Sequence, residues 1–363
     1  MRIGILGAGQ LAQLLAHSAY TLGFETLCYA ESSQQPATRN SPLFIGELKD
    51  NKRLQEFLSK VDLITIENEN IEVETLQFLE SHLPLLPNSK AIGITQDRLL
   101  EKQFFKSLNI PTTEFIAIDS LTALDSASKQ LPFPALLKTR RFGYDGKGQV
   151  KLSTAHQTSS AWKTINEMPA ILENFIAFDT EVSIIGARNA AKQISCYPLI
   201  TNHHEQGVLR ISTLSTTPHS LQQQAENHLS TVLKELDYIG VLAIEFFVKN
   251  NQLYANEMAP RVHNSGHLTL EAFSCSQFEL HLRALANLPL PTLHLKQPTA
   301  MINLISKLPD NKLFLKEPNL HFYDYGKLAR PYRKLGHITI TNNNVQALNE
   351  KAIQIHQSVT DLK

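Results

Sequence analysis

The chain has 363 residues, and its 34 lysine and arginine side chains are balanced by 34 aspartate and glutamate side chains. Proteins that bind nucleic acids or membrane surfaces depend largely on net positive charge, so a formal charge of zero argues against both kinds of partner. A chain of this length is expected to fold into two or three domains.

The cysteine content and the hydrophobic pattern predict a cytoplasmic protein. Cys28, Cys196 and Cys275 are few and widely spaced, which suits a reducing compartment and offers neither a disulfide framework nor a Cys-x-x-Cys metal pair. Gly7 and Gly9 interrupt the only region that resembles a signal peptide. No segment approaches the ~20 continuous apolar residues of a membrane helix, so we expect no membrane partner.

The first ninety residues alternate between short apolar runs and amphipathic segments. The predicted elements are a strand at Arg2–Leu6, a helix at Gln10–Leu22, a strand at Glu25–Ala30, a helix at Lys52–Ser59 and a strand at Asp62–Glu67. This order is typical of a parallel, doubly wound sheet. Pro84 and Pro87 are expected to end the unit near residue 90.

A glycine-rich turn follows the first predicted strand. Its pattern, Gly7-x-Gly9-x-x-Ala12, matches the dinucleotide fingerprint, and Glu31 lies where an acid would bind the ribose of NAD. The same turn can also hold any phosphate at a helix N-terminus. The turn alone therefore leaves an NAD site and a phosphate site open.

The middle and the end of the chain are predicted to be mixed α+β. Asn88 or Thr95 is expected to cap one helix that carries Asp97, Arg98 and Lys102. A small lobe of short strands should run from Thr112 to about Ile176, followed by a larger α+β unit to about Pro291. The remaining predicted elements are helices at Ser120–Lys129, Ser159–Asn166 and from Val345, and strands at Thr299–Ile305 and His337–Thr341.

A second glycine-rich segment lies between two predicted strands. Lys138 emerges from an apolar strand, and Gly143, Gly146 and Gly148 follow within ten residues. Such a hairpin can cover a polyphosphate with its backbone N–H groups and the lysine. No Gly-Lys-Ser/Thr opens a helix here, so the segment is not a Walker A loop. The alternative is a flexible, exposed turn.

Two acids lie on neighbouring apolar strands near residue 250. Glu245 interrupts the run from Gly240 to Val248, and Asn256 and Glu257 follow the next short strand. A carboxylate in such a run is costly to bury without a cation, and paired carboxylates with an amide suit Mg²⁺. The polar run Arg261–His267 would suit an anionic substrate. The alternative is a pair of unrelated acids and a solvated loop.

Two further segments have chemical interest. The strand Leu172–Ile176 is followed by Glu181, which could place backbone groups and a carboxylate at a nucleotide's adenine and ribose. Near the C-terminus, Lys327, Arg330, Arg333 and Lys334 form a cationic cluster beside a proline, which suggests a shaped turn that faces an anion. A solvated basic surface is the alternative.

In this order, the motifs resemble those of the ATP-grasp enzymes and, more closely, those of the 5-(carboxyamino)imidazole ribonucleotide synthase family. The matching segments are Gly-x-Gly-Gln-Leu at 7–11, Arg98, the run from Phe142 to Gln149, the run from Asn256 to His267, Gln277-Phe278-Glu279 and Arg330-Pro331-x-Arg333-Lys334-x-Gly336-His337. The resemblance implies α/β and α+β architecture: a Rossmann-like N-terminal domain (1–96), an ATP-grasp fold (97–296, with a lid lobe at about 112–176) and a small C-terminal domain (297–363).

The resemblance also implies a reaction. The γ-phosphoryl group of ATP would be transferred to bicarbonate, and the resulting carboxyphosphate would carboxylate the amine of aminoimidazole ribonucleotide in purine biosynthesis. Phosphoryl transfer of this kind depends on positioning and charge neutralisation, with Mg²⁺ as the cofactor. A homodimer is expected from the same resemblance.

The family's functional residues correspond to the following positions. ATP would be held by Arg98, Lys138, Gly143, Tyr144, Asp145, Gly146, Lys147, Gly148, Gln149, Glu173, Asn174, Phe175, Ile176, Glu181, His204, Asn256 and Glu257. The ribonucleotide and bicarbonate would be held by Gly9, Gln10, Leu11, Tyr144, Asp145, Lys147, Arg261, His263, Asn264, Ser265, Lys327, Arg330, Arg333 and Lys334. Lys138, Arg261, His263 and Asn264 would be catalytic, and Glu245 and Glu257 would ligate the metal.

The chain departs from the family pattern at two places near the expected ribonucleotide site. Ile66-Glu67-Asn68-Glu69-Asn70 stands where the family usually has Tyr-Glu-Phe-Glu-Asn, and Tyr332 replaces the usual glycine. Three other functions share parts of this pattern: a ribonucleotide transformylase or another ATP-grasp ligase with a different acyl donor, an NAD-dependent dehydrogenase, and a non-catalytic nucleotide-binding module. The Lys138 segment and the Glu245/Glu257 pair have no role in a dehydrogenase.

Overall fold

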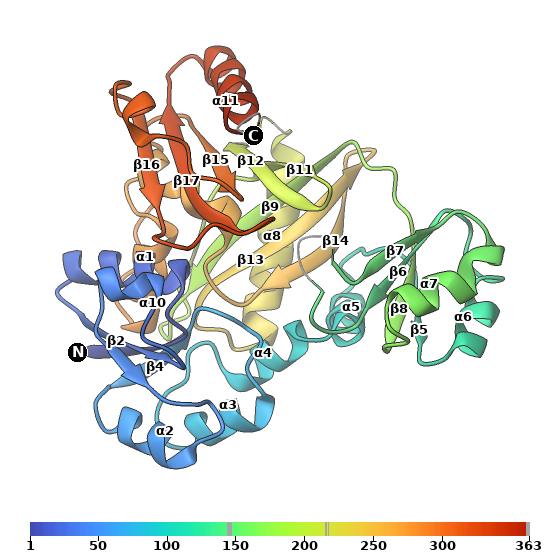
Figure 1. The fold of residues 1–363 in the computed structure, drawn as a ribbon, viewed down its shortest axis with the longest axis horizontal. Coiled ribbons are helices and arrows are strands. Elements are labelled where there is room, and N and C mark those ends of the chain that lie inside the picture. The colour runs from blue at the N-terminus through green and yellow to red at the C-terminus, as the bar shows by residue number, and fades with distance from the viewer. Residues whose placement is uncertain (144–146, 215, 217, 361–363) are drawn as a thin grey trace.

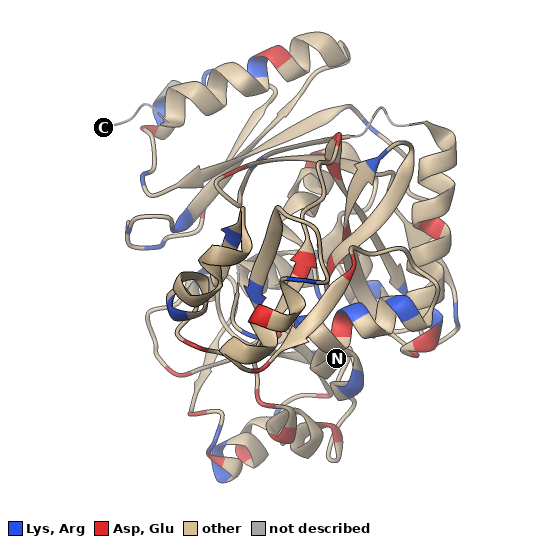
Figure 2. Cartoon of the chain, turned by 90° about the vertical axis from the view of Figure 1, so that its right-hand side faces the viewer, with Lys and Arg blue, Asp and Glu red and all other residues tan. Residues whose placement is uncertain are grey.

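The computed structural model describes residues 1–143, 147–214, 216 and 218–360. Within them the chain forms three β-sheets, with a lobe around β5–β8 projecting from the main body (Figure 1). Lysine and arginine residues are interspersed with acidic ones along the ribbon in Figure 2, as expected for a chain without net charge. Among the described residues, no helix combines the length and the apolar character needed to cross a membrane.

The N-terminal sheet is parallel, with the strand order β3-β2-β1-β4. It contains β1 (Arg2–Leu6), α1 (Gln10–Thr21), β2 (Glu25–Ala30), the 3₁₀ turn η1 (Pro36–Arg39), β3 (Leu43–Ile45), α2 (Asn51–Leu58), β4 (Leu63–Ile66) and α3 (Val73–Glu80). The predicted doubly wound pattern is confirmed. The sequence did not predict β3, because three residues are too few to show a regular pattern of apolar and polar side chains. The carboxyl ends of β1 and β4 lie side by side, so the glycine turn after β1 meets the acids after β4.

The single helix predicted after residue 88 is wrong, because the chain forms two helices here. The Asn88 side chain accepts a hydrogen bond from Ala91 N and starts α4 (Ser89–Thr95). The Asp97 side chain accepts one from Leu99 N and starts α5 (Arg98–Ser107). Thr95 therefore ends a helix, and Asp97 begins one, because each carboxylate or amide cap satisfies N–H groups that the helix leaves free.

The projecting lobe is built on an antiparallel sheet with the order β5-β8-β6-β7. Its elements are β5 (Phe115–Ile118), α6 (Leu121–Ala127), β6 (Ala135–Thr139), β7 (Gln149–Leu152), η2 (Ala155–Gln157), α7 (Thr158–Thr164) and β8 (Ala170–Asn174). The two helices cover one face of the sheet, and their apolar side chains form a separate core around Trp162. The predicted helices at 120–129 and 159–166 correspond to α6 and α7.

A nine-stranded sheet forms the centre of the molecule, with the order β14-β13-β9-β11-β12-β15-β17-β16 and β10 paired to β9. Its first half comprises β9 (Thr180–Arg188), β10 (Ile194–Cys196), β11 (Ile200–Glu205), β12 (Val208–Leu214), α8 (His219–Glu235), β13 (Gly240–Lys249), β14 (Gln252–Ala259), η3 (Asn264–Leu268), α9 (Thr269–Ala272) and α10 (Gln277–Leu285). Alternate residues of β9 and β13 face opposite sides. Val182 and Ile184 pack with α8, whereas Ile185 and Ala187 pack with α1 and α10.

The C-terminal strands continue this sheet instead of forming their own. They are β15 (Thr299–Ile305), β16 (Leu320–Asp324) and β17 (Lys334–Thr341), with η4 (Asn311–Leu313) between them and α11 (Val345–Thr360) over one face. β15 pairs with β12, so the last region shares its sheet with the central one. The sequence did not reveal β16, and the domain limits at 96 and 296 stay a prediction.

Candidate active site

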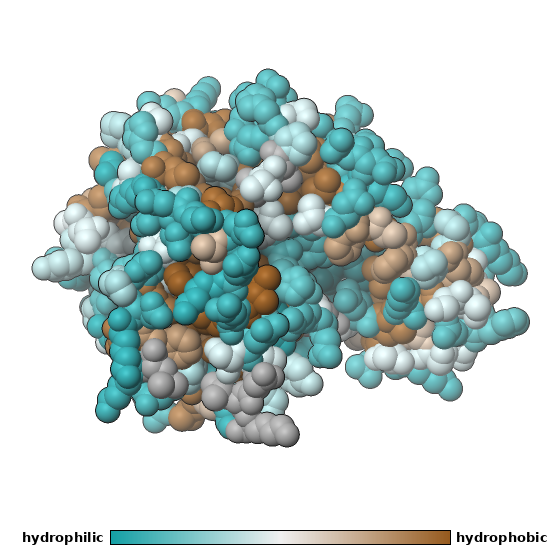
Figure 3. Space-filling view, turned by 90° about the horizontal axis from the view of Figure 1, so that it is seen from above, coloured by the Kyte–Doolittle hydropathy of each residue, from teal (hydrophilic) through white to brown (hydrophobic). Residues whose placement is uncertain are grey.

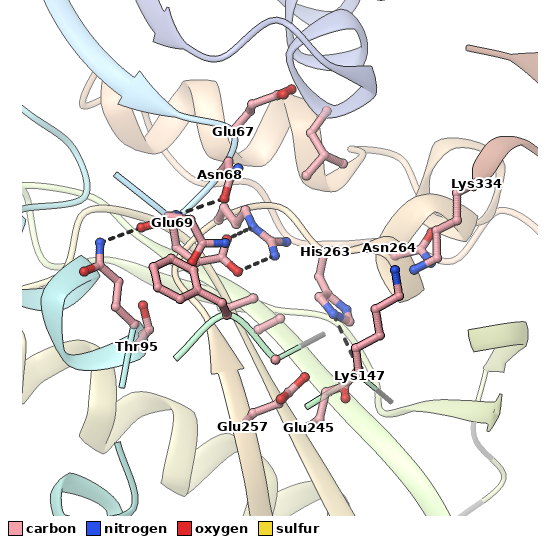
Figure 4. A pocket seen from close by; sticks show the side chains of 18 of the residues that line it. Glu67, Asn68, Glu69, Thr95, Lys147, Glu245, Glu257, His263, Asn264 and Lys334 are labelled. Carbon is pink, nitrogen blue, oxygen red and sulfur yellow. Dashed lines mark hydrogen bonds and ion pairs between the residues drawn. The ribbon is translucent and has the colours of Figure 1, made fainter. Parts of the chain in front are cut away.

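One cavity of about 780 Å³ lies where the N-terminal sheet, the projecting lobe and the nine-stranded sheet meet. In the space-filling view, the surface between the main body and the lobe is mostly hydrophilic (Figure 3). Figure 4 shows acids from the N-terminal and central sheets around the cavity, with Lys147 and Lys334 near His263. Predicted residues that line it are Gln10, Leu11, Arg98, Gly143, Lys147, Glu245, Glu257, Arg261, His263, Asn264, Lys327, Arg330, Arg333 and Lys334.

The two predicted metal ligands face each other across adjacent strands. Glu245 on β13 is paired in register with Glu257 on β14, and a β-bulge at Asn256 follows directly. β14 runs on to Ala259, so the expectation that Glu257 leaves the strand is wrong. His263 Nε2 lies 3.4 Å from Glu245, and Arg98 Nη2 lies 3.7 Å from Glu257. Burial, and then the charge of Glu257, raise the pKa of Glu245 to about 7.

Asn256 lies away from the main cavity, in a small recess that it shares with Glu181. Glu181 forms an ion pair with His204 on the neighbouring strand β11. Burial alone would lower the pKa of His204, but the hydrogen bond with Glu181 and the charges of Glu245 and Glu181 together outweigh it and raise the pKa. The bulge thus turns Glu257 toward the main cavity and Asn256 toward the adjoining recess.

The glycine-rich segment forms the predicted hairpin between β6 and β7. Arg98 donates to Thr139 O at 3.1 Å and to Gly143 O at 3.0 Å, which joins the hairpin to the start of α5. Gly148 has a φ of +70°, and a Cβ there would lie 2.5 Å from Thr139 Oγ1, so this position requires glycine. Tyr144, Asp145 and Gly146 lie outside the described residues, and Gln149 is exposed at the start of β7.

Lys138 and Glu173, both predicted to hold ATP, form a buried ion triad with Lys102. Lys138 and Lys102 each pair with one carboxylate oxygen of Glu173, the latter at 2.9 Å, and all three side chains are buried. Lys102 also donates to Thr112 and Thr113 at 2.9 Å each. Burial alone would raise the pKa of Glu173, but the two lysines lower it well below its usual range. The triad fixes Lys138 at the inner end of the hairpin.

The residues after Glu173 connect the lobe to the central sheet. Asn174 Nδ2 donates to Glu114 at 3.2 Å, Phe175 N donates to Pro134 O at 3.2 Å, and Ile176 is half-buried. The Lys151 ammonium lies 4.0 Å from the centre of the Phe175 ring. The backbone of this connection is therefore fixed on the lobe side.

The acids after β4 hold the cavity residues of other segments. Glu67 accepts hydrogen bonds from Gly9 N at 2.6 Å and Ala12 N at 2.7 Å, so it occupies the N-terminus of α1. A dinucleotide or a phosphate would need the same donors, which argues against the expectation that this turn itself holds the ligand's phosphate. Glu69 pairs with Arg261 through two hydrogen bonds, one of 2.9 Å. Burial alone would raise the pKa of Glu69, but Arg261 lowers it.

The basic cluster lines the same cavity as the hairpin. Lys327 donates to Gln10, and burial lowers the pKa of its ammonium to about 8. Arg333 Nη1 donates to Leu328 O at 3.1 Å, which shapes the turn. Tyr332 adopts a φ of +61° and is exposed at the cavity, so this chain tolerates a tyrosine in a conformation that favours glycine.

Ser265 is fully buried, and its hydroxyl contacts His263 Nδ1 and Ser183 Oγ at 2.8 Å each. Its predicted direct contact with substrate is therefore replaced by a contact with His263.

Our sequence interpretation also missed Glu101, whose carboxylate is buried and accepts from Met258 N at 2.7 Å. Burial and the charge of Glu257 raise the pKa of Glu101 to about 8. The available signal was a polar residue on the apolar side of a helix.

A glycine-rich hairpin and an antiparallel sheet that share a cavity with paired acids define the ATP-grasp class. Family models agree: a ribonucleotide synthetase preATP-grasp domain matches residues 1–96, an ATP-grasp domain matches 103–278, and a phosphoribosylaminoimidazole carboxylase C-terminal domain matches 299–351. A curated N5-carboxyaminoimidazole ribonucleotide synthase of Pseudomonas aeruginosa is 40% identical over 340 residues, 94% of each chain.

Solved structures agree over nearly the whole chain. The N5-carboxyaminoimidazole ribonucleotide synthetase of Thermus thermophilus superposes with a TM-score of 0.94 at 41% identity, covering 99% of both chains. The Aspergillus clavatus synthase in complex with ADP and 5-aminoimidazole ribonucleotide superposes with a TM-score of 0.90 at 26% identity, covering 99% of this chain and 98% of that one. The chain belongs to the N5-carboxyaminoimidazole ribonucleotide synthase family.

Proposed function

We propose that the chain carboxylates 5-aminoimidazole ribonucleotide to N5-carboxyaminoimidazole ribonucleotide with ATP and bicarbonate, as a step of purine biosynthesis. The observation that carries this proposal is the single cavity lined by the hairpin, the Glu245/Glu257 pair and the basic cluster. Each part suits one reactant: the hairpin a polyphosphate, the acids a metal–phosphate group, and the cations a ribonucleotide phosphate. A cytoplasmic homodimer remains part of the proposal.

The chemistry takes two steps that share an intermediate. A bicarbonate oxygen attacks the γ-phosphorus of ATP, the bond to the β-phosphate oxygen breaks, and ADP and carboxyphosphate form. The amine of the ribonucleotide then attacks the carboxyl carbon, inorganic phosphate leaves, and the amine loses a proton. Because the first step mainly redistributes charge on phosphoryl oxygens, positioned cations serve it better than a covalent nucleophile.

The residues present fit a divalent cation. Two carboxylates lie opposite each other, and burial and then the charge of Glu257 raise the pKa of Glu245, so a bound cation would stabilise its charged form. Among the described residues, no group of three acidic, histidine or cysteine side chains could hold a metal alone, so nucleotide phosphates would complete the coordination. Glu245 and Glu257 would hold Mg²⁺, which supplies charge neutralisation on the phosphates when bound.

The remaining residues position the reactants. Glu69 orients Arg261 by two hydrogen bonds, so its outer N–H groups have a fixed direction in the cavity. The basic cluster, not the amides of the α1 N-terminus, would hold the ribonucleotide phosphate, since Glu67 occupies those amides. The hairpin would close over the nucleotide and keep water from carboxyphosphate.

The direct test is phosphate release from ATP with each substrate omitted in turn. We expect release to require bicarbonate and to be coupled to ribonucleotide carboxylation. Release that formate supports and bicarbonate does not would indicate a transformylase. Glu257→Gln should abolish ADP formation while the fold survives, whereas Glu235→Gln, at the exposed end of α8, should not. Near-normal turnover in both Glu245→Gln and Glu257→Gln would refute the metal assignment.

A further inference from the structure

A continuous row of buried polar groups leads away from His263, into the protein. His263 Nδ1 lies 2.8 Å from Ser265 Oγ, which lies 2.8 Å from Ser183 Oγ. Asn202 Nδ2 donates to Ser183 Oγ at 3.1 Å, and Ser212 Oγ donates to Asn202 Oδ1 at 2.9 Å. The three serines are fully buried, and Asn202 is 5% exposed. Every member has a partner, so the row meets the condition under which polar groups can be buried.

Sheet order brings these residues together. Asn202 on β11 lies opposite Ser212 on β12, and β11 also pairs with β9, which carries Ser183. Ser183 is in turn the cross-strand partner of Glu245 on β13. The row therefore lies next to Glu245 at two points, Ser183 and His263. Its members lie on four separate segments of the chain. Apolar residues surround these positions along β9, so the row is a local exception within a hydrophobic core.

The hydrogen bonds in this row run in one direction. The backbone N–H of Ser265 donates to His263 Nδ1 at 3.3 Å, which requires Nδ1 to carry a lone pair and no proton. The Ser265 hydroxyl must then donate to Nδ1 and accept from Ser183, and the Ser183 hydroxyl must accept from Asn202. The amide orientation of Asn202, with its oxygen toward Ser212, agrees with this assignment.

The backbone of His263 is held separately by Gln277. The Gln277 side chain accepts from His263 N at 2.9 Å and donates to His263 O at 2.7 Å, and it is fully buried. Ring and backbone are therefore both fixed. With Nδ1 unprotonated, a neutral ring carries its hydrogen on Nε2, the atom that faces Glu245 across 3.4 Å at the cavity.

We propose that Asn202, Ser183 and Ser265 hold His263 as the Nε2–H tautomer, so that the ring donates a hydrogen bond into the reaction centre and does not act as its general base. Ser183 and Asn202 are then positioning residues for the carboxylation, although neither lines the main cavity. The catalytic part of this inference rests on the proposed function, whereas the tautomer does not. An Nε2–H donor suits the oxygens of bicarbonate or of the transferred carboxyl group.

The tautomer is tested first in the unmodified protein. Nitrogen NMR of ¹⁵N-histidine-labelled enzyme should show one ring with a protonated Nε2 and an unprotonated Nδ1. The chain has 14 histidines, so the signal is assigned by its loss in His263→Gln. A ring protonated at Nδ1, or at both nitrogens, overturns the proposal whatever the enzyme's activity, and so is distinguishable from failure of the proposed function.

Variants test the positioning role. Asn202→Asp places an acceptor where Ser183 needs a donor. It should therefore reverse the direction of the hydrogen bonds and move the ring proton of His263 from Nε2 to Nδ1. Ser183→Ala should interrupt it. We expect each to lower kcat by about 10- to 100-fold, the scale of a misplaced catalytic group, with KM for ATP unchanged within about twofold. Ser183→Thr, which keeps the hydroxyl, should recover most of the loss.

Ser212→Ala is the matched control, since it removes a serine of equal burial at the far end and leaves the direction intact. We expect it to lower kcat by less than about threefold. An equal loss in Ser212→Ala and Ser183→Ala would show that the row only stabilises the sheet, and would overturn the positioning role. A variant that fails to fold leaves the decision to the NMR result on the unmodified protein.

Discussion

The buried triad of Lys102, Glu173 and Lys138 should hold the projecting lobe to helix α5. Lys102 lies on α5, whereas Lys138 and Glu173 lie on β6 and β8 of the lobe. We therefore expect Lys102→Met, which keeps the side-chain length and removes the charge, to destabilise the lobe. The change also removes the donors to Thr112 and Thr113.

The magnitude follows from what remains after the substitution. Removing one partner of a buried ion pair costs about 3–5 kcal/mol, because the other charge is left uncompensated. In Lys102→Met the Glu173 carboxylate keeps Lys138, so we expect the lower end, about 3 kcal/mol. Glu173→Gln leaves two lysines buried without an anion, so it should cost the upper end, about 5 kcal/mol.

The assay is urea unfolding followed by tryptophan fluorescence. The chain has one tryptophan, and Trp162 lies in the core of the lobe, so its signal reports the part of the molecule in question. Lys106→Met is the control: Lys106 is on the same helix, four residues on and exposed, and its loss should cost less than about 0.5 kcal/mol. A Lys102→Met variant within about 1 kcal/mol of the control would refute the reasoning.

Three further outcomes are expected. Burial lowers the pKa of Lys327 to about 8, so this lysine loses its positive charge as the pH rises through 8. We therefore expect kcat/KM for the ribonucleotide to fall over that pH range. Lys327→Arg should abolish the fall, and pH profiles of both enzymes check this. Arg333→Ala should raise KM for the ribonucleotide by about 10- to 150-fold, the value of a charge-assisted hydrogen bond, and KM for ATP by less than about twofold in steady-state assays. Gly148→Ala should destabilise the hairpin by about 1–2 kcal/mol or more and raise KM for ATP, whereas Gly93→Ala, where a Cβ meets only a contact of 3.5 Å, should be neutral or stabilising by thermal unfolding.

Local patterns were enough to predict the first strands of the N-terminal sheet and the hairpin that lines the cavity. Alternating apolar runs placed β1, β2 and β4, and three glycines placed the hairpin after Lys138. Elements that depend on their neighbours were missed. β3 and β16 have three and five residues and become strands only because β2 and β17 offer them a free edge. The helix limits at Thr95 and Asp97 were misplaced because two cap residues occur close together.

Whether two site residues could be paired from the sequence depended on the length of chain that joins them. Glu245 and Glu257 belong to one hairpin, whose turn residues Asn250 and Asn251 both adopt positive φ. Such a two-residue turn fixes the register as far as Phe246 and Ala255, and the bulge at Asn256 then brings Glu257 opposite Glu245. Turn and bulge both lie within this one hairpin, so the facing of the two acids is a local property. Glu69 and Arg261 are 192 residues apart and come from different sheets, and no short-range pattern relates them.

The proposed metal-site acids and Arg261 are positioned by different parts of the fold. The acids expected to hold the metal are positioned by the central sheet alone, whereas Arg261 takes its direction from Glu69 at the end of β4. Glu67, two residues earlier, fixes the first turn of α1 in the same way. The segment from Glu67 to Glu69 therefore determines how the N-terminal sheet meets the reaction centre. Changes in this segment should act on the carboxylation of the ribonucleotide and leave ATP binding, which we propose depends on the hairpin and the triad, largely unaffected.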